Sequence, residues 1–122
     1  MYDIIFYKDK HGREPITEYL DELRSNVITN KDSRTKNEKI YKYFEIIERM
    51  GTRAGLPYIT HVEGDIWGLR PLKDRFFFLY CKGDKLIALH HFYKKTKKTP
   101  QKEINQAKRN LNDYLERIDN FE

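Results

Sequence analysis

The sequence lacks the features of secreted, membrane and disulfide-stabilised proteins. Its one cysteine, Cys81, excludes an internal disulfide and a cysteine-rich zinc site. No apolar run approaches the roughly 18 residues of a membrane span, and no charged start followed by an apolar stretch indicates a secretory signal. With 122 residues, of which 39% are hydrophobic, the chain is long enough for one core. We therefore expect a single cytoplasmic domain over residues 1–122, with no membrane contact.

Motifs for nucleotides and metal ions are also missing. The sequence contains no P-loop, no GxGxxG, no HExxH and no EF-hand loop. His90 and His91 are adjacent, and neighbouring residues on a strand point to opposite faces, so the two cannot bind one metal ion together. We therefore predict no metal site and no cofactor. Any chemistry has to come from Arg, Lys, His, Tyr and carboxylate side chains.

Positive charge is present, and it is concentrated in one part of the chain. The formal net charge is +5, yet residues 70–102 alone carry +8, which leaves −3 for the rest. Such a segment predicts one surface that binds a polyanion, with a solvated lysine face as the alternative. The cations in the window are Arg70, Lys73, Arg75, Lys82, Lys85, Lys94, Lys95, Lys97, Lys98 and Lys102.

Hydrophobic periodicity predicts the order strand, two helices, three strands, helix. Gly83-Asp84 separates the last two strands and predicts an antiparallel hairpin. The fold class is α+β, with a twisted antiparallel sheet (β-α-α-β-β-β-α) and helices packed on one face. The expected strands are 2–7, 66–72, 76–81 and 86–93, and the expected helices are 15–23, 33–50 and 100–118.

The strand order predicts that the cations meet at one end of the sheet. Arg70 and Arg75 flank the turn between two antiparallel strands, and the strand that precedes Lys94 and Lys95 ends toward the same edge. Because side chains alternate along a strand, Arg70 should point away from the core. The same rule sends Lys94 and Lys95 to opposite faces, so that one of them reaches a substrate.

Cations beside aromatic residues resemble a groove that holds phosphates and stacks bases. Such a set can support cleavage of RNA, in which the 2′-hydroxyl attacks the adjacent phosphorus and guanidinium groups match the charge that builds on the phosphoryl oxygens. Lysine, tyrosine or histidine could act as the base and the acid. The candidate catalytic residues are Arg70, Arg75, Tyr93, Lys94 and Lys95, and the candidate RNA-binding residues are Lys73, His91, Phe92, Lys97 and Lys98.

Five consecutive motifs carry a family resemblance: Leu69-Arg70-Pro71, Arg75–Tyr80, Leu86–Phe92, Lys94–Pro100 and Glu103–Ala107. Together they resemble the HigB-type, phage-derived Gp49-like branch of the RelE/ParE toxin superfamily. The resemblance implies a RelE-like fold and the toxin of a type II toxin–antitoxin pair. It also implies an mRNA endoribonuclease that works on translating mRNA in the ribosome, and a helix-turn-helix antitoxin (HigA-like) from the same operon as its partner.

Two other functions are compatible with the sequence. ParE-type relatives share the fold and inhibit gyrase, so the fold alone does not select the substrate. A phage-derived protein could also bind nucleic acid through the same groove without cleaving it. The basic window and the motifs around Arg70 and Lys94 favour RNA.

Overall fold

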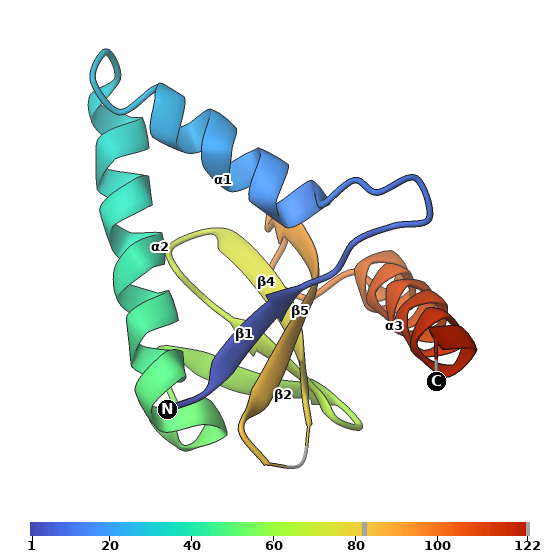
Figure 1. Cartoon of the computed structure of the whole chain (residues 1–122). Helices are drawn as coiled ribbons and strands as arrows, with labels where there is room; N and C mark the ends of the chain where they lie inside the picture. The colour runs from blue at the N-terminus through green and yellow to red at the C-terminus, as the bar shows by residue number, and fades with distance from the viewer. Residues whose placement is uncertain (82, 122) are drawn as a thin grey trace.

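Five strands form one mixed sheet in the computed structural model of the chain (Figure 1). The structure describes residues 1–81 and 83–121, and side chains as far as Ile118. The strand order is β1-β5-β4-β3-β2; β1 runs parallel to β5, and the other neighbours are antiparallel. The strands are β1 (Asp3–Phe6), β2 (Ile59–Glu63), β3 (Ile66–Leu69), β4 (Asp74–Tyr80) and β5 (Lys85–Tyr93).

The α+β class is confirmed, but the antiparallel sheet of the prediction needs two corrections. The edge strand β2 was not predicted, because polar residues occupy its middle and only one side of an edge strand packs. The first strand was predicted, but its parallel pairing with β5 was not. A parallel partner 82 residues away leaves no turn signal in the sequence.

Three α-helices flank the sheet: α1 (Pro15–Ser25), α2 (Lys31–Met50) and α3 (Gln101–Phe121). A 3-10 turn (Gly51–Ala54) follows α2. The α2 helix begins earlier than expected because the Asn30 side chain accepts a hydrogen bond from the Ser33 amide at 3.0 Å. It ends at Gly51, where φ is 58° and an added Cβ would lie 2.6 Å from Cζ of Tyr2. None of these helices, over the residues described, is long and apolar enough to cross a membrane.

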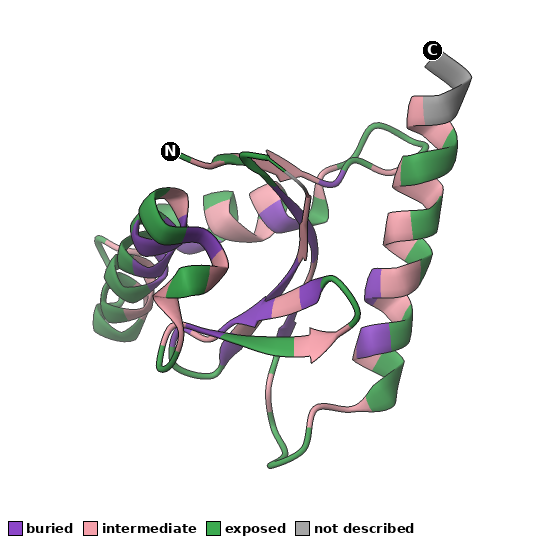
Figure 2. Cartoon of the chain, turned by 90° about the horizontal axis from the view of Figure 1, so that it is seen from below, coloured by how far each residue is buried: buried purple, intermediate pink, exposed green. Residues whose placement is uncertain are grey.

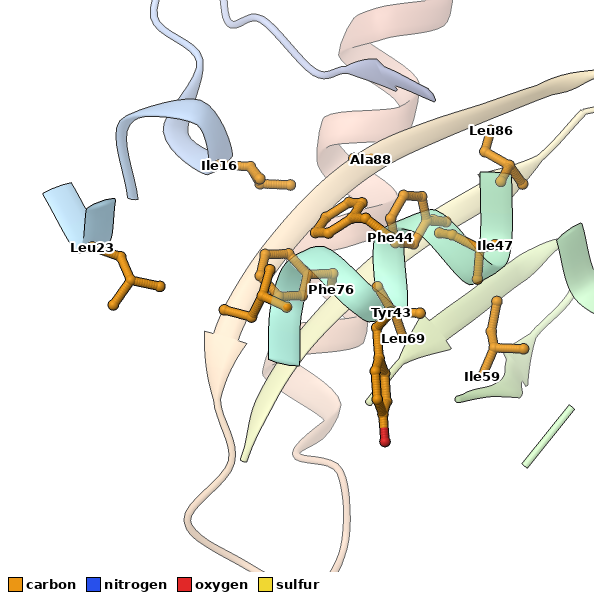
Figure 3. Packing of buried hydrophobic residues seen from close by; sticks show 12 residues of the cluster. Ile16, Leu23, Tyr43, Phe44, Ile47, Ile59, Leu69, Phe76, Leu86 and Ala88 are labelled. Atoms are coloured by element: carbon orange, nitrogen blue, oxygen red, sulfur yellow. The ribbon is translucent and has the colours of Figure 1, made fainter. Parts of the chain in front are cut away.

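The helices cover both faces of the sheet, which corrects the prediction that they share one face (Figure 2). On one face, Phe44 of α2 packs against Phe76 of β4 with ring centroids 5.2 Å apart (Figure 3). On the other face, Ile104 of α3 packs into a second cluster that contains Phe77. The run of three buried phenylalanines in β4 is the sequence signal for this arrangement, since alternating residues can all be buried only when both faces are covered.

A bulge in β5 decides which way the two histidines face. Phe77 pairs with His90 and Phe78 pairs with Ala88, so Leu89 is an extra residue. Leu89 and His90 consequently both face α3, and His91 faces α1 and α2.

Candidate nucleic-acid interface

The turn between β3 and β4 and the end of β5 lie together at one end of the sheet. The Lys94 amide donates to the Lys73 carbonyl at 2.8 Å, and the Asp74 amide donates to the Pro71 carbonyl at 3.1 Å. Nη1 of Arg75 donates to the carbonyls of Leu72 at 2.7 Å and Asp74 at 2.9 Å, which holds the guanidinium against the turn. Lys73, Arg75 and Lys94 therefore lie together at this end of the sheet, as predicted. Arg70, the other predicted member, follows β3, and its amide donates to the Tyr58 carbonyl at 2.9 Å.

A hollow of about 330 Å³ opens between this turn and the connection from β5 to α3. Its lining contains no carboxylate, and we call it the cationic hollow. Lys94 and Lys95 both line it, which corrects the expectation that they face opposite ways: β5 ends at Tyr93, so strand alternation no longer applies. Its lining residues are Lys73, Arg75, Lys94, Lys95, Thr96 and Lys97.

The cations of this end repel one another. Burial and then the charge of Arg70 lower the pKa of Arg75 from its usual value. Burial, followed by the charges of Arg75 and Arg70, lowers the pKa of Lys94. Over the described ranges 1–81 and 83–121, no ion pair links Arg70, Arg75 or Lys94 to a carboxylate. An anionic ligand would relieve this repulsion.

A second hollow of about 500 Å³ lies on the other side of the turn, and we call it the tyrosine hollow. Tyr93 is 46% exposed and lines this hollow together with Lys36 of α2. Tyr93 therefore lies on the α2 side of the sheet and not beside Arg75 in the cationic hollow. Nζ of Lys36 on α2 lies 5.0 Å from the Tyr93 ring centroid. Lys73 lines both hollows and joins them.

Three predicted RNA-binding residues lie elsewhere. Phe92 is only 7% exposed and belongs to the core under α3, so the expectation of an exposed base-stacking ring is wrong. His91 is stacked on Tyr19 with ring centroids 3.9 Å apart and is covered by α1, which removes it from the cationic hollow. Lys98 is exposed but is not part of the lining of either hollow. Lys82, another cation of the basic window, lies outside the described residues.

A buried carboxylate beside the turn was missed. Asp74 is 0% exposed, and its Oδ1 accepts a hydrogen bond from the Tyr19 hydroxyl at 2.7 Å and lies 2.7 Å from His91 Nε2. Nζ of Lys36 lies 3.3 Å from Oδ2. Burial raises the pKa of Asp74, but the hydrogen bonds from His91 and Tyr19 outweigh it and the net pKa is lowered. Sequence alternation with buried Phe76 could have indicated the buried position.

Groups of three or more His, Cys, Asp or Glu that could hold a metal ion do not occur in the part of the chain that the structure describes. The charged and phenolic side chains at the two hollows are instead one guanidinium, five ammonium groups, one phenol and one carboxylate, that of Asp32 in the tyrosine hollow. The cations and the phenol are the groups relevant to an anionic ligand. These groups bind phosphate and exchange protons, which are the two tasks of phosphodiester chemistry.

Comparison with known proteins identifies one family. The family described as Phage derived protein Gp49-like (DUF891) matches residues 29–112. The matched span contains α2, strands β2 to β5, both hollows and more than half of α3. None of the curated proteins gives a significant match to the chain.

Proposed function

The chain belongs to the phage-derived Gp49-like family of RelE/HigB-like toxins, and from that premise we propose that it is the HigB-type toxin of a type II toxin–antitoxin pair. Its proposed activity is cleavage of mRNA in the cytoplasm, on the ribosome, by a single domain that spans residues 1–122. The observation that carries this proposal is the cationic hollow. Its lining has five cations and no carboxylate, a composition suited to a phosphate backbone.

The proposed reaction is a transesterification within the RNA. The 2′-oxygen attacks the adjacent phosphorus as its proton leaves to a base, and the bond from phosphorus to the 5′-oxygen breaks as that oxygen receives a proton. The products are a 2′,3′-cyclic phosphate and a 5′-hydroxyl. Arg70 and Arg75 would bind the phosphoryl oxygens, whose negative charge increases in the transition state.

Lys94 is the best-supported group for proton transfer. Lys94 lines the cationic hollow beside Arg75, and burial followed by the charges of Arg75 and Arg70 lowers its pKa, the direction that favours release of its proton. Lys95 lines the same hollow and is the second candidate. Tyr93 faces the tyrosine hollow, where its exposed ring could stack on the neighbouring base or its hydroxyl could exchange a proton.

Flanking phosphates would be bound by the remaining lysines of this end. Lys73 lines both hollows, and Lys97 lies in the connection to α3. Lys98 is exposed in that same connection, which projects beyond the sheet (Figure 2). This placement would let one RNA strand pass around the end of the sheet, from the cationic hollow to the tyrosine hollow.

The proposed partner is a helix-turn-helix antitoxin (HigA-like) encoded beside this chain. It would either cover the cationic hollow with acidic residues or hold the chain where it cannot enter the ribosome. A stable complex on co-expression supports the toxin assignment, and failure of the neighbouring protein to co-purify contradicts it.

Induction from a tightly controlled promoter tests the proposal directly. We expect growth arrest, together with mRNA 5′ ends that appear within minutes and are absent with Arg75→Ala. Arrest with a DNA-damage response and intact mRNA would instead identify a gyrase inhibitor, and no arrest would leave a nucleic-acid-binding protein. The purified chain should also cleave free RNA at high protein concentration in the presence of a chelator. Activity that a chelator abolishes and manganese restores would contradict the metal-free reaction.

A further inference from the structure

One buried carboxylate connects four elements next to the cationic hollow. Asp74 is the first residue of β4 and is 0% exposed. It contacts Tyr19 of α1, Lys36 of α2 and His91 of β5 at 2.7, 3.3 and 2.7 Å. Lys36 also donates to the Tyr19 hydroxyl at 3.2 Å, so the four side chains form one closed network.

This network stabilises the packing of the sheet against two helices poorly, because burying its charges costs solvation free energy. A buried carboxylate loses its hydration, and apolar residues of similar volume are often as stabilising as a buried ion pair. The surrounding core is apolar, with Phe76 and Phe44 in contact beside the network. A charged side chain at this buried position therefore indicates a task besides packing.

The position of the carboxylate relative to the site indicates that task. Asp74 directly precedes Arg75, and its own carbonyl accepts a hydrogen bond from the Arg75 guanidinium at 2.9 Å. Its amide closes the β3–β4 turn on Pro71. On the other side, its carboxylate holds Lys36, whose ammonium lies over the ring of Tyr93. Asp74 is thus the sequence neighbour of Arg75, and a single side chain, Lys36, connects it to Tyr93.

We propose that Asp74 and His91 are a positioning pair, in which His91 fixes the buried Asp74 carboxylate. The residue fixed in this way holds Arg75 through its backbone carbonyl on one side of the sheet, and its carboxylate holds Lys36 over the Tyr93 ring on the other. The inference rests on the proposed nuclease function for its kinetic consequence. Neither residue touches RNA. Their loss misplaces the groups that do, and a displacement of about 1 Å at a reacting group can reduce a rate on the order of 100-fold.

The chain offers a matched control in the adjacent histidine. His90 is 3.0 Å from a carboxylate oxygen of Glu103 and is similarly enclosed, with 17% side-chain exposure against 14% for His91. It faces α3, and it lines neither hollow. If His91 had a purely structural role, His91→Ala would lower stability but, like His90→Ala, would leave kcat of the folded protein unchanged. A positioning role separates them.

The experiment measures kcat, KM and thermal unfolding of the whole chain with a short single-stranded RNA, together with the affinity for the same RNA carrying a 2′-deoxy scissile nucleotide. For His91→Ala we expect kcat to fall about 10- to 100-fold with KM and affinity changed less than about threefold. His91→Gln, whose amide nitrogen can reach the same carboxylate, should recover most of the rate. His90→Ala should lower the unfolding temperature but leave kcat unchanged.

Wild-type kcat in folded His91→Ala overturns the proposal, as does an equal loss of kcat in His90→Ala. If His91→Ala does not fold, Tyr19→Phe removes one hydrogen bond to the same carboxylate oxygen, and a fall in kcat at unchanged KM is then the expected result. If the wild-type chain cleaves neither the free RNA nor mRNA on purified ribosomes, the nuclease function fails independently. The positioning pair is then judged by hydrogen exchange: the amides of residues 70 and 72–75 should exchange faster in His91→Ala than in His90→Ala, and equal exchange rejects it.

Discussion

The two faces of the sheet handle charge in opposite ways at the end where β4 and β5 meet the turn. On the face toward α1 and α2, the Asp74 carboxylate is enclosed by Lys36, whose ammonium compensates its charge, and by the His91 ring. On the other side, Arg75 and Lys94 line a hollow whose other charged members are lysines. Asp74 thus belongs to a neutralised cluster with Lys36, whereas the next residue, Arg75, belongs to an uncompensated cluster with Lys94.

This difference indicates that the neutralised cluster has a structural role and that the uncompensated cluster is a binding surface. Opposite charges brought together in the interior stabilise one arrangement of the elements that carry them. Like charges brought together disfavour the folded state. Burial first, and then the neighbouring cations, lower the pKa of Arg75 and of Lys94, so repulsion acts in the same direction as burial. Their grouping is therefore explained better by a polyanionic ligand than by folding. The neutralised cluster then serves to hold the uncompensated one in place.

Removal of a guanidinium from the uncompensated side should have the largest effect. Arg70→Ala and Arg75→Ala should each slow cleavage of free RNA by about 100- to 1,000-fold, because a transition-state phosphate contact contributes about 3–4 kcal/mol. Single-turnover cleavage measures this loss. Arg49→Ala, at the exposed far end of α2, is the matched control and should cleave normally. Wild-type growth arrest by both arginine variants would place the site elsewhere.

Lys94→Arg tests proton transfer separately from charge. The variant keeps a cation in the hollow, but a guanidinium holds its proton throughout the accessible pH range. We expect RNA affinity to persist while the cleavage rate falls about 100-fold, the usual contribution of general acid–base catalysis. A pH–rate profile should lose its Lys94-dependent limb. Lys102→Arg on α3 provides the control, and an unaltered rate in Lys94→Arg would assign proton transfer to another residue.

Asp74→Asn should weaken the neutralised side in a pH-dependent way. Because folding lowers the pKa of Asp74, its ionised form stabilises the native state above the usual carboxyl pKa of about 4, and this stabilisation is lost as the pH falls through the lowered value. Urea unfolding at pH 7 should show a loss of about 1–3 kcal/mol. The difference from wild type should shrink at pH 3. A difference independent of pH would contradict the charged assignment, and exposed Asp21→Asn serves as the comparison.

The smallest effect is expected from single lysines around the hollows. Lys73→Ala and Lys97→Ala should each weaken binding of single-stranded RNA a few-fold and reduce the slope of log affinity against log salt by about 0.7, as one phosphate contact is lost. Fluorescence anisotropy between about 50 and 200 mM salt measures the slope. Lys39→Ala on α2, whose ammonium lies over the Tyr43 ring, should leave the slope unchanged. Equal slopes in all three variants would remove these lysines from the RNA path.

Much of the cationic end could be predicted from the sequence, whereas its buried support could not. Arg70 and Arg75 flank a turn between neighbouring strands, so their proximity follows from the local chain. Phe92 has an aromatic ring of the kind that stacks on bases, but α3 covers it. Asp74 looked like a turn residue, because its partners Tyr19 and Lys36 come from helices 55 and 38 positions earlier. Contacts over such separations leave no periodic signal in the sequence.

The sequence by itself determined the α+β class, the β4–β5 hairpin, the stretches that form α2 and α3, and the concentration of positive charge in residues 70–102. These features depend on periodicity and on near neighbours along the chain. Only the tertiary structure decided that α3 packs on the opposite face, that β1 pairs parallel to β5, and that His91 rather than His90 meets Asp74. The last choice rests on one extra residue, Leu89, because strand alternation fixes relative orientation only until a bulge reverses it.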